Sequence, residues 1–252
     1  MRKSQSMAAK PELSIIIPAY NEGGRILPTL HETQEYLASG QSWHGVEVIV
    51  VCDGCTDNTE AVLRGCAMPD LRVISYPENR GKGYAVKTGI LASRGQVVVF
   101  ADADGATPIR EISHLAPFLT DGYDLAVGSR RAPGSRVTGA QPWQRRVLGR
   151  FFALATQLAL GLGVADTQCG FKMFRGEGAR SLFQDVNCAG FAFDLELLVL
   201  ARARGLRVAE VGVEWHDRGQ STVSPWRDGL RMLGALWTLR RRPLPPPASG
   251  IR

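Results

Sequence analysis

The sequence predicts an α/β fold: a single domain with a mostly parallel, Rossmann-like sheet flanked by helices. Short apolar runs rich in β-branched residues recur along the first half of the chain. They lack the polar alternation of a strand with one face in water, so we expect them to be buried on both faces. Segments with helical features separate these runs, and strands connected through helices pair in parallel with right-handed crossovers.

The expected elements of the first half follow in order. The segment 22–37 carries apolar residues at Ile26, Leu27, Leu30 and Leu37, which indicates a helix. The run from Thr56 to Thr59 offers N-cap side chains for the next helix. Expected strands are 13–17, 46–51, 71–75, 96–101 and 125–127, and expected helices are 22–37, one that starts within 56–59 and runs through Leu63, 83–93 and 109–119.

The second half is less regular. Glycines and prolines predict a mobile loop over 131–142, followed by a helix over 143–164. The chain then returns to the sheet over 166–174, forms a helix over 191–203 and ends the sheet with a strand over 206–213. We therefore expect a flexible leader (1–12), the α/β domain (13–224), an amphipathic helix (225–242) and a disordered proline-rich tail (243–252).

Composition limits the class of protein. The formal charge is +6, largely from arginine, which suits phosphate-bearing partners or simply a solvated basic face. Cys52 and Cys55 form a CxxC without the second pair of a zinc site, so reduced thiols in the cytoplasm are the better interpretation. The leader lacks the apolar segment of a signal peptide, and no run approaches the roughly 18 apolar residues of a membrane-spanning helix.

Polar and acidic residues follow the expected strands, where ligands bind in sheets of this kind. Asp102 and Asp104 come directly after the strand 96–101. Two carboxylates this close repel each other unless a cation lies between them, and oxygen ligands favour Mg²⁺ or Mn²⁺. Such a triplet also occurs in ordinary loops, but its place at a strand end, before Gly105, favours a metal site.

Two further strand ends are candidates for nucleotide contacts. Asp53 follows the second strand, where an acid contacts a base or ribose or else caps a helix. The segment 80–83, Arg-Gly-Lys-Gly, precedes a helix whose N-terminus can hold an anion. It is neither a Walker A loop nor a full dinucleotide fingerprint.

The combination of motifs resembles family 2 glycosyltransferases of the GT-A fold. The resemblance rests on SIIIPAYNE (14–22), VCDGCTDNT (51–59), NRGKG (79–83), DADGAT (102–107), GSR (128–130) and DTQCGFK (166–172), and it extends to about Ser221. These motifs are most similar to the dolichyl-phosphate β-glucosyltransferase and polyprenyl-phosphate glycosyltransferase branch. Cys52 and Cys55 depart from the pattern, since relatives commonly carry Asp and Ser there.

The resemblance implies a role for each matching residue. Asp102 and Asp104 would hold Mg²⁺ or Mn²⁺ on the diphosphate of a UDP-sugar, with His216 as a candidate third ligand or a structural residue. Arg130 would face the acceptor phosphate or the transferring group. The nucleotide-sugar would be bound by Pro18, Tyr20, Glu22, Asp53, Lys82, Asp102 and Arg218.

The resemblance implies a transfer with inversion at the anomeric carbon. Whether this reaction needs a general base depends on the acceptor. A phosphate acceptor is already anionic and needs no strong base, whereas a hydroxyl acceptor needs one, for which Asp194 or Glu196 is available. These two acids point to different sides of a helix and can also cap its start. Glucose is the expected sugar, and the acceptor is a lipid phosphate or a soluble molecule. A metal-dependent nucleotidyltransferase is the alternative of another class, and no nucleic-acid-binding motif is present.

Contact with the inner face of a membrane is expected if the acceptor is a lipid. In 143–164, an arginine-rich start is followed by Phe151, Phe152, Leu154, Leu158 and Leu160. This pattern suits either an interfacial helix or packing on the sheet, and we expect packing on the sheet. In 225–242, Trp226, Leu230, Leu233 and Trp237 share one face among arginines, which suits either an interfacial helix or packing on the domain.

Overall fold

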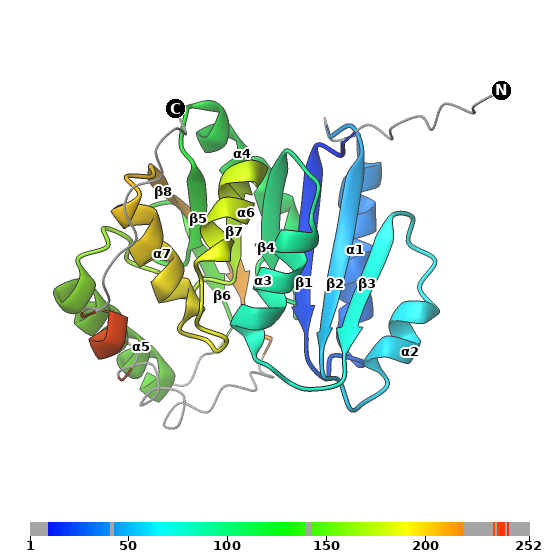
Figure 1. Ribbon diagram of the computed structural model, residues 1–252, viewed down its shortest axis with the longest axis horizontal. Helices are drawn as coiled ribbons and strands as arrows, with labels where there is room; N and C mark the ends of the chain where they lie inside the picture. The colour runs from blue at the N-terminus through cyan, green and yellow to red at the C-terminus, as the bar shows by residue number, and fades with distance from the viewer. Residues whose placement is uncertain are drawn as a thin grey trace.

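The protein is built around a mixed sheet that is parallel except for one strand (Figure 1). The computed structural model describes residues 10–40, 43–139, 143–218, 234, 236–239 and 241. Within these residues the main sheet has the order β3-β2-β1-β4-β7-β5-β8. Its strands are β1 (Leu13–Ala19), β2 (Val46–Asp53), β3 (Leu71–Tyr76), β4 (Val97–Ala101), β5 (Leu125–Ser129), β7 (Phe171–Arg175) and β8 (Val208–Gly212).

The odd strand, β7, lies inside the sheet, between β4 and β5. It pairs antiparallel with β4 on one side and with β5 on the other, whereas all other neighbours in this sheet are parallel. The residues that precede β7 therefore lie at the edge where the parallel strands end. This arrangement confirms the expected mostly parallel α/β sheet and brings the segment 165–170 to the same edge as the loops after β1, β2, β4 and β5.

Helices cover both faces of the sheet. They are α1 (Ile26–Ala38), α2 (Thr59–Arg64), α3 (Lys82–Ala92), α4 (Ile112–Thr120), α5 (Trp143–Leu160), α6 (Gly176–Gln184) and α7 (Phe193–Ala203). In Figure 1, α3, α6 and α7 lie in front of the sheet. The opposite face packs against α1 and α4, and α5 lies beyond the β5–β8 side of the sheet.

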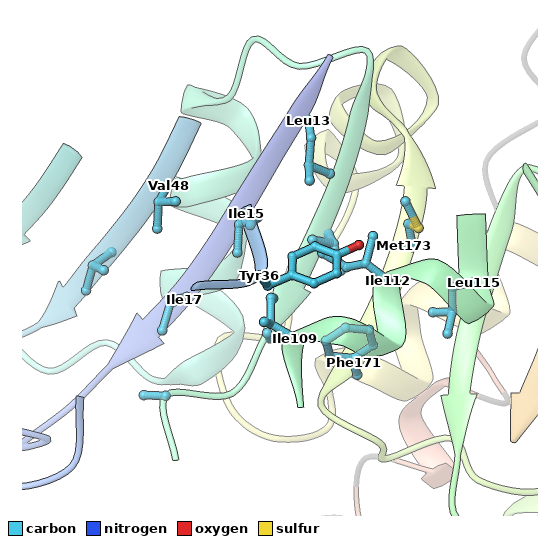
Figure 2. Packing of buried hydrophobic residues seen from close by; sticks show 14 of the residues in the cluster. Leu13, Ile15, Ile17, Tyr36, Val48, Ile109, Ile112, Leu115, Phe171 and Met173 are labelled. Carbon is cyan, nitrogen blue, oxygen red and sulfur yellow. The ribbon is translucent and has the colours of Figure 1, made fainter. Parts of the chain in front are cut away.

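The strands form because their residues can be buried on both sides. In β1, Leu13, Ile15 and Ile17 join the core that includes α1 and α4, whereas Ile16 joins the core that includes α3, α6 and α7. Every residue of β1 is buried, which explains its continuous apolar run. Figure 2 shows the first of these cores, with Tyr36 lying among Ile15, Ile109 and Ile112.

Some elements differ from the expectation. The segment 131–142 contains a short strand, β6 (Arg136–Thr138), which pairs with β9 (Glu214–His216) in a separate two-stranded sheet. Helix α6 was not expected, and the helix expected over 109–119 begins with a 3-10 turn at Ile109–Glu111. A three-residue strand and a single 3-10 turn carry too little periodicity to be recognised from sequence.

Several expected regions lie outside the described residues. They include the leader up to residue 9, the tail from residue 243, and most of the helix expected over 225–242. Of that helix, 234, 236–239 and 241 are described as helical, and Leu236 and Leu239 pack with Leu195 of α7. In the part of the chain that the structure describes, no helix is both long and apolar enough to cross a membrane.

Candidate active site

The carboxyl ends of the parallel strands bring together acids and one lysine from three loops. Asp102 and Asp104 follow β4, and Glu22 follows β1. Lys82 is the first residue of α3, and its Nζ lies 2.6 Å from Asp102 Oδ1. Residues separated by 20 to 80 positions in the chain thus meet at one edge, as the strand-end rule predicts.

A glycine before β7 allows this arrangement. The Asp102 N–H donates to the Gly170 carbonyl oxygen across 3.1 Å. A Cβ atom at Gly170 would lie only 1.9 Å from Asp102 Oδ2, so any side chain there would displace the carboxylate. Asp104 is held from the other side, where its Oδ1 accepts the Ala106 N–H at 3.0 Å. The two acids are therefore positioned by backbone contacts.

The charges at this edge are not balanced locally. Burial and the charge of Asp102 raise the pKa of Asp104 above its ordinary value. Burial raises the pKa of Glu22, against the nearby Arg25 guanidinium, and the charges of Asp104 and Asp102 raise it further. Burial alone would lower the pKa of Lys82, but the carboxylates of Asp102 and Asp194 raise it. A further positive charge at the acids would relieve this repulsion.

These acids fit a divalent cation that is shared with a ligand. Glu22 Oε1 lies 2.7 Å from Arg25, but its buried Oε2 has no hydrogen-bond partner among the described residues. Carboxylate oxygens suit Mg²⁺ or Mn²⁺, which usually keep open positions for phosphate oxygens. In the described residues no three Asp, Glu, His or Cys side chains converge as a complete metal site. Asp102 and Asp104 could therefore hold a metal only with ligands from elsewhere.

His216 does not join this pair. Its Nδ1 lies 2.6 Å from the Thr138 hydroxyl of β6, and its Nε2 lies 3.2 Å from Glu214 Oε1. Its backbone N–H donates to the Ala106 carbonyl at 2.7 Å. Both ring nitrogens thus have partners within the small sheet, and this arrangement supports the structural alternative for His216 rather than a third metal ligand.

Arg218 lies beside the acidic loop. Its guanidinium donates to the Gly105 carbonyl at 3.1 Å and lies 3.9 Å from Glu32. The side chain is 42% exposed, so it retains donors that face solvent. An arginine in this position can contact a phosphate bound at the acidic loop. Residues 219–221, which follow it, lie outside the described part of the chain.

Asp53 shapes the loop between β3 and α3. Its two carboxylate oxygens accept the backbone N–H groups of Arg80 at 2.7 Å and Gly81 at 2.8 Å. Gly81 has a φ of +101°, and a Cβ there would lie 2.5 Å from the Ala189 carbonyl oxygen, so this turn requires glycine. The carboxylate of Asp53 thus fixes the turn that begins α3 and places Lys82.

The loop after β1 carries the other expected nucleotide contacts. Pro18 is buried within β1, whereas Tyr20 is 43% exposed at the end of the strand. Asn21 has a φ of +55°, and its Oδ1 accepts the Thr56 N–H from the loop after β2 at 2.8 Å. This contact ties the two loops together and leaves the Tyr20 ring available to a planar ligand.

Arg130 is held at the end of β5 by Asp166. Its Nε and one terminal nitrogen donate to the two Asp166 oxygens at 2.7 and 2.8 Å, and its backbone N–H donates to Oδ2 at 2.9 Å. The guanidinium also lies over the Trp215 ring, 5.4 Å from the centroid. Burial opposes the charge, but the Asp166 hydrogen bonds raise the pKa of Arg130, so it stays cationic.

The two candidate bases have separate partners. Asp194 Oδ1 accepts a hydrogen bond from the fully buried Lys172 at 2.5 Å. Glu196 accepts the backbone N–H groups of Asn187 and Cys188, the latter at 2.6 Å. The two acids do point to different partners, but each is buried and engaged. This placement does not favour Glu196 as a base. Asp194 is linked to the acidic edge through its charge, which raises the pKa of Lys82.

Sequence reasoning did not single out several residues that complete the site. Asp166 was noted only within a motif, and Lys172, Glu210 and Gly170 were given no role. Glu210 accepts the N–H groups of Ala165 and Asp166, each at 2.9 Å, and so fixes the loop that holds Arg130. The available signal was the return of 166–174 to the sheet, since an antiparallel strand begins at the edge where parallel strands end.

The chain matches known proteins over most of its length. The model of the family described as glycosyl transferase family 2 matches residues 14–183. The chain is 40% identical over 224 residues to a dolichyl-phosphate beta-glucosyltransferase of Trichomonas vaginalis. This match covers 83% of this chain and 65% of that protein. It is 37% identical over 235 residues to the dolichyl-phosphate beta-glucosyltransferase of Drosophila melanogaster, covering 88% of this chain and 72% of that protein.

A solved structure shares the fold. The glucosyl-3-phosphoglycerate synthase of Mycobacterium tuberculosis, solved with Mn²⁺, UDP and glucosyl-3-phosphoglycerate, superposes with a TM-score of 0.63 at 23% identity. The superposition covers 96% of this chain and 82% of that chain. The family model, the two relatives and the shared architecture show that the chain belongs to glycosyl transferase family 2 and is a glycosyltransferase with the GT-A fold.

Proposed function

We propose that this glycosyltransferase transfers glucose from UDP-glucose to a polyprenyl phosphate, with inversion at the anomeric carbon and with Mg²⁺ or Mn²⁺. The observation that carries the proposal is the meeting of Asp102, Asp104 and Lys82 at the carboxyl edge of the sheet. Such a group suits a diphosphate bound together with a divalent cation. Family membership favours glycosyl transfer over the nucleotidyltransferase alternative.

The donor would lie across the loops after β1, β2 and β4. Tyr20 offers an exposed ring to the uracil. The Oε2 atom of Glu22, which has no hydrogen-bond partner among the described residues, could accept a hydrogen bond from a hydroxyl group of the UDP-sugar. Lys82 and Arg218 would bind the diphosphate. The roles of Pro18 and Asp53 are then indirect, since the first is buried in β1 and the second holds the turn before Lys82.

Asp102 and Asp104 would hold the cation, which, when bound, stabilises the negative charge of the departing diphosphate. Lys82 and Arg218 would add fixed positive charge at the same diphosphate. These groups are held in place before the reaction, which makes their electrostatic stabilisation effective. Arg130, held by two hydrogen bonds to Asp166, would present its remaining donors to the acceptor phosphate.

The state of the candidate bases supports a phosphate acceptor. A hydroxyl acceptor has to lose a proton during transfer, whereas a phosphate oxygen is already anionic. Asp194 is paired with Lys172, and Glu196 binds two backbone N–H groups. The names of the two relatives, both dolichyl-phosphate beta-glucosyltransferases, point to the same class of acceptor.

The experiment that tests the proposal offers the purified chain a panel of donors and acceptors. UDP-glucose, UDP-galactose and GDP-mannose are each supplied with Mg²⁺ or Mn²⁺ and with one of three acceptors: a short-chain prenyl phosphate, the prenyl alcohol of the same chain length, or 3-phosphoglycerate. We expect UDP-glucose and the prenyl phosphate to give the highest kcat/KM, with a β-linked product identified by NMR. Preferential transfer to 3-phosphoglycerate, or to a prenyl alcohol of the same chain length, would overturn the assignment of the acceptor.

A further inference from the structure

One face of α5 is apolar and exposed, contrary to the expectation that it packs on the sheet. Val147, Phe151, Leu154 and Leu158 follow one another at intervals of four, three and four residues and therefore share one side of the helix. Their exposed fractions are 57%, 61%, 59% and 80%. We call these four residues the α5 stripe.

The rest of α5 accounts for its attachment to the domain. Phe152 and Leu160 pack with Leu195 of α7 and with Leu236 and Leu239 near the C-terminus. The helix is therefore anchored through one face while the stripe on another face is left in water. A contiguous exposed apolar surface of this kind marks a site of interaction with another molecule or with a membrane.

The charge around the stripe identifies the partner. Residues 131–165, which include α5, contain five arginines and no aspartate or glutamate. Two exposed arginines contact the backbone of the helix: Arg131 donates to the carbonyl of Gly149, within the helix, at 2.9 Å, and Arg202 donates to the carbonyl of Leu160, its last residue, at 2.7 Å. Near the C-terminus, Arg241 lies over the 61% exposed ring of Trp237. A segment that holds arginines and no acids and that carries exposed apolar side chains suits anionic lipid headgroups over an apolar layer.

The position of α5 relates it to the candidate active site. Arg131, which binds Gly149 within α5, directly follows Arg130. Figure 1 shows α5 at the end of the molecule toward which β1, β2 and β3 point, so it lies at the same end as the catalytic loops. A lipid surface that contacts α5 would therefore hold a phosphate headgroup on the side of the site where Arg130 lies.

We infer that the α5 stripe docks on an anionic membrane surface and brings the site to a lipid-bound acceptor. The inference rests on the proposed function for its purpose, but the docking itself depends only on the stripe and its arginines. Phe151, Leu154 and Leu158 enter the acyl boundary, and the surrounding arginines contact the headgroups. The helix lies along the surface and does not cross the bilayer, in keeping with its mixed composition.

Vesicle sedimentation tests the docking on the full chain. The probes are vesicles of phosphatidylcholine alone and of phosphatidylcholine mixed with phosphatidylglycerol. The variants are Leu158→Gln, the double variant Leu154→Gln/Leu158→Gln, and the control Leu91→Gln, which makes the same change at a 40% exposed position of α3. All these side chains are exposed, so we expect the variants to fold, and circular dichroism with thermal unfolding checks this.

We expect binding only to the anionic vesicles, weakened by salt and reduced about tenfold or more in the double variant, because two apolar contacts are lost. The Leu91→Gln control should bind as the original chain does. Equal binding of the double variant and the control would overturn the inference. The inference would also be overturned if the stripe forms a dimer interface. In that case sedimentation velocity would show a dimer that becomes monomeric in the double variant, and vesicle binding would not change.

A second measurement separates this inference from the proposed function. Transfer to a water-soluble short-chain prenyl phosphate needs no membrane, so the double variant should keep its turnover there while losing turnover on long-chain acceptor in anionic vesicles. If no prenyl phosphate is glucosylated in any form, the proposed function fails while the vesicle result still decides the docking. If both turnovers are unchanged in the double variant, docking through the stripe is wrong.

Discussion

Asp166 binds the Arg130 guanidinium with both carboxylate oxygens, at 2.7 and 2.8 Å, although 35 residues lie between them in the chain. Asp166 is itself 3% exposed, and its backbone N–H donates to Glu210. The arginine is therefore directed by a chain of contacts that runs from β8 through the loop before β7 to the end of β5. A guanidinium held in this way keeps its remaining donors in a fixed direction.

Removing this support should impair catalysis more than donor binding. We expect Asp166→Asn to lower kcat about tenfold to a hundredfold with little change in the Kd for UDP, because Arg130 keeps its charge but loses its orientation. Arg130→Ala should have the larger effect on kcat, and Arg130→Lys should restore little, since lysine lacks the planar pair of donors. Steady-state kinetics and UDP titration calorimetry measure the two quantities. An equal loss of UDP affinity would move Arg130 to the donor pocket.

The same pair predicts a pH dependence of stability. Burial opposes ionisation of Asp166, but the hydrogen bonds from Arg130 lower its pKa in the folded protein below the value of about 3.9 that it has when unfolded. The pair therefore contributes its full stability above about pH 4 and loses it as the pH falls through the lower folded pKa. Urea unfolding of the original chain and of Asp166→Asn should differ by about 3 kcal/mol at neutral pH. That difference should narrow below about pH 4, and a constant difference across this range would contradict the prediction.

Asp104 should be required for activity and not for folding. We expect Asp104→Asn to abolish transfer because the cation loses an anionic ligand, while the removal of one like charge beside Asp102 should leave the unfolding midpoint unchanged or higher. EDTA should likewise stop the original enzyme, and Mg²⁺ or Mn²⁺ should restore it. Isothermal titration of Mn²⁺ in the presence of UDP provides a readout that does not depend on turnover. Near-normal activity of Asp104→Asn, or activity after exhaustive chelation, would show that this acid pair is not a metal site.

Gly170 should be intolerant of a side chain for a reason confined to the site. Gly170→Ala would bring a Cβ to within 1.9 Å of Asp102 Oδ2, and we expect it to reduce kcat/KM about a hundredfold by displacing that carboxylate. The matched control is Gly178→Ala in α6, where an added Cβ meets nothing within 4 Å. That variant should keep full activity and gain about 0.5–1 kcal/mol of stability from helix propensity. Similar kinetics for the two variants would mean that the close approach at Gly170 has no role in the reaction.

The CxxC should be neither a zinc site nor a reactive thiol pair. Cys52 is fully buried in β2, and burial, with the neighbouring Cys55, raises its pKa to about 12. A thiol in this state is protonated at neutral pH and binds metal poorly. We expect Cys52→Ala to keep its turnover in reducing buffer, and elemental analysis of the original chain to find no stoichiometric zinc. A large loss of bound zinc in the variant would revive the metal interpretation of this motif.

The order of strands and helices up to β5 could be predicted from sequence, because uninterrupted apolar runs such as Ile15 to Ile17 occur only where both faces of a strand are buried. The candidate residues after those strands could also be predicted, since parallel strands end at one edge. Asp102, Asp104 and Lys82 follow from this rule alone. The sequence by itself determined the fold class, the family motifs and the edge where the site lies.

Only the tertiary structure decided which of these residues have partners and which face outward. The antiparallel pairing of β7 brings Asp166 to Arg130 and Gly170 to Asp102, and no local pattern encodes pairing between distant segments. The same is true of Glu196 and His216, whose chemistry suits catalysis or metal binding but whose contacts are with a loop and a small sheet. Helix α5 is the clearest case. Periodicity identifies its apolar side, but whether that side meets the sheet or the solvent depends on how the helix is anchored, and Phe152 and Leu160 anchor it with the stripe exposed.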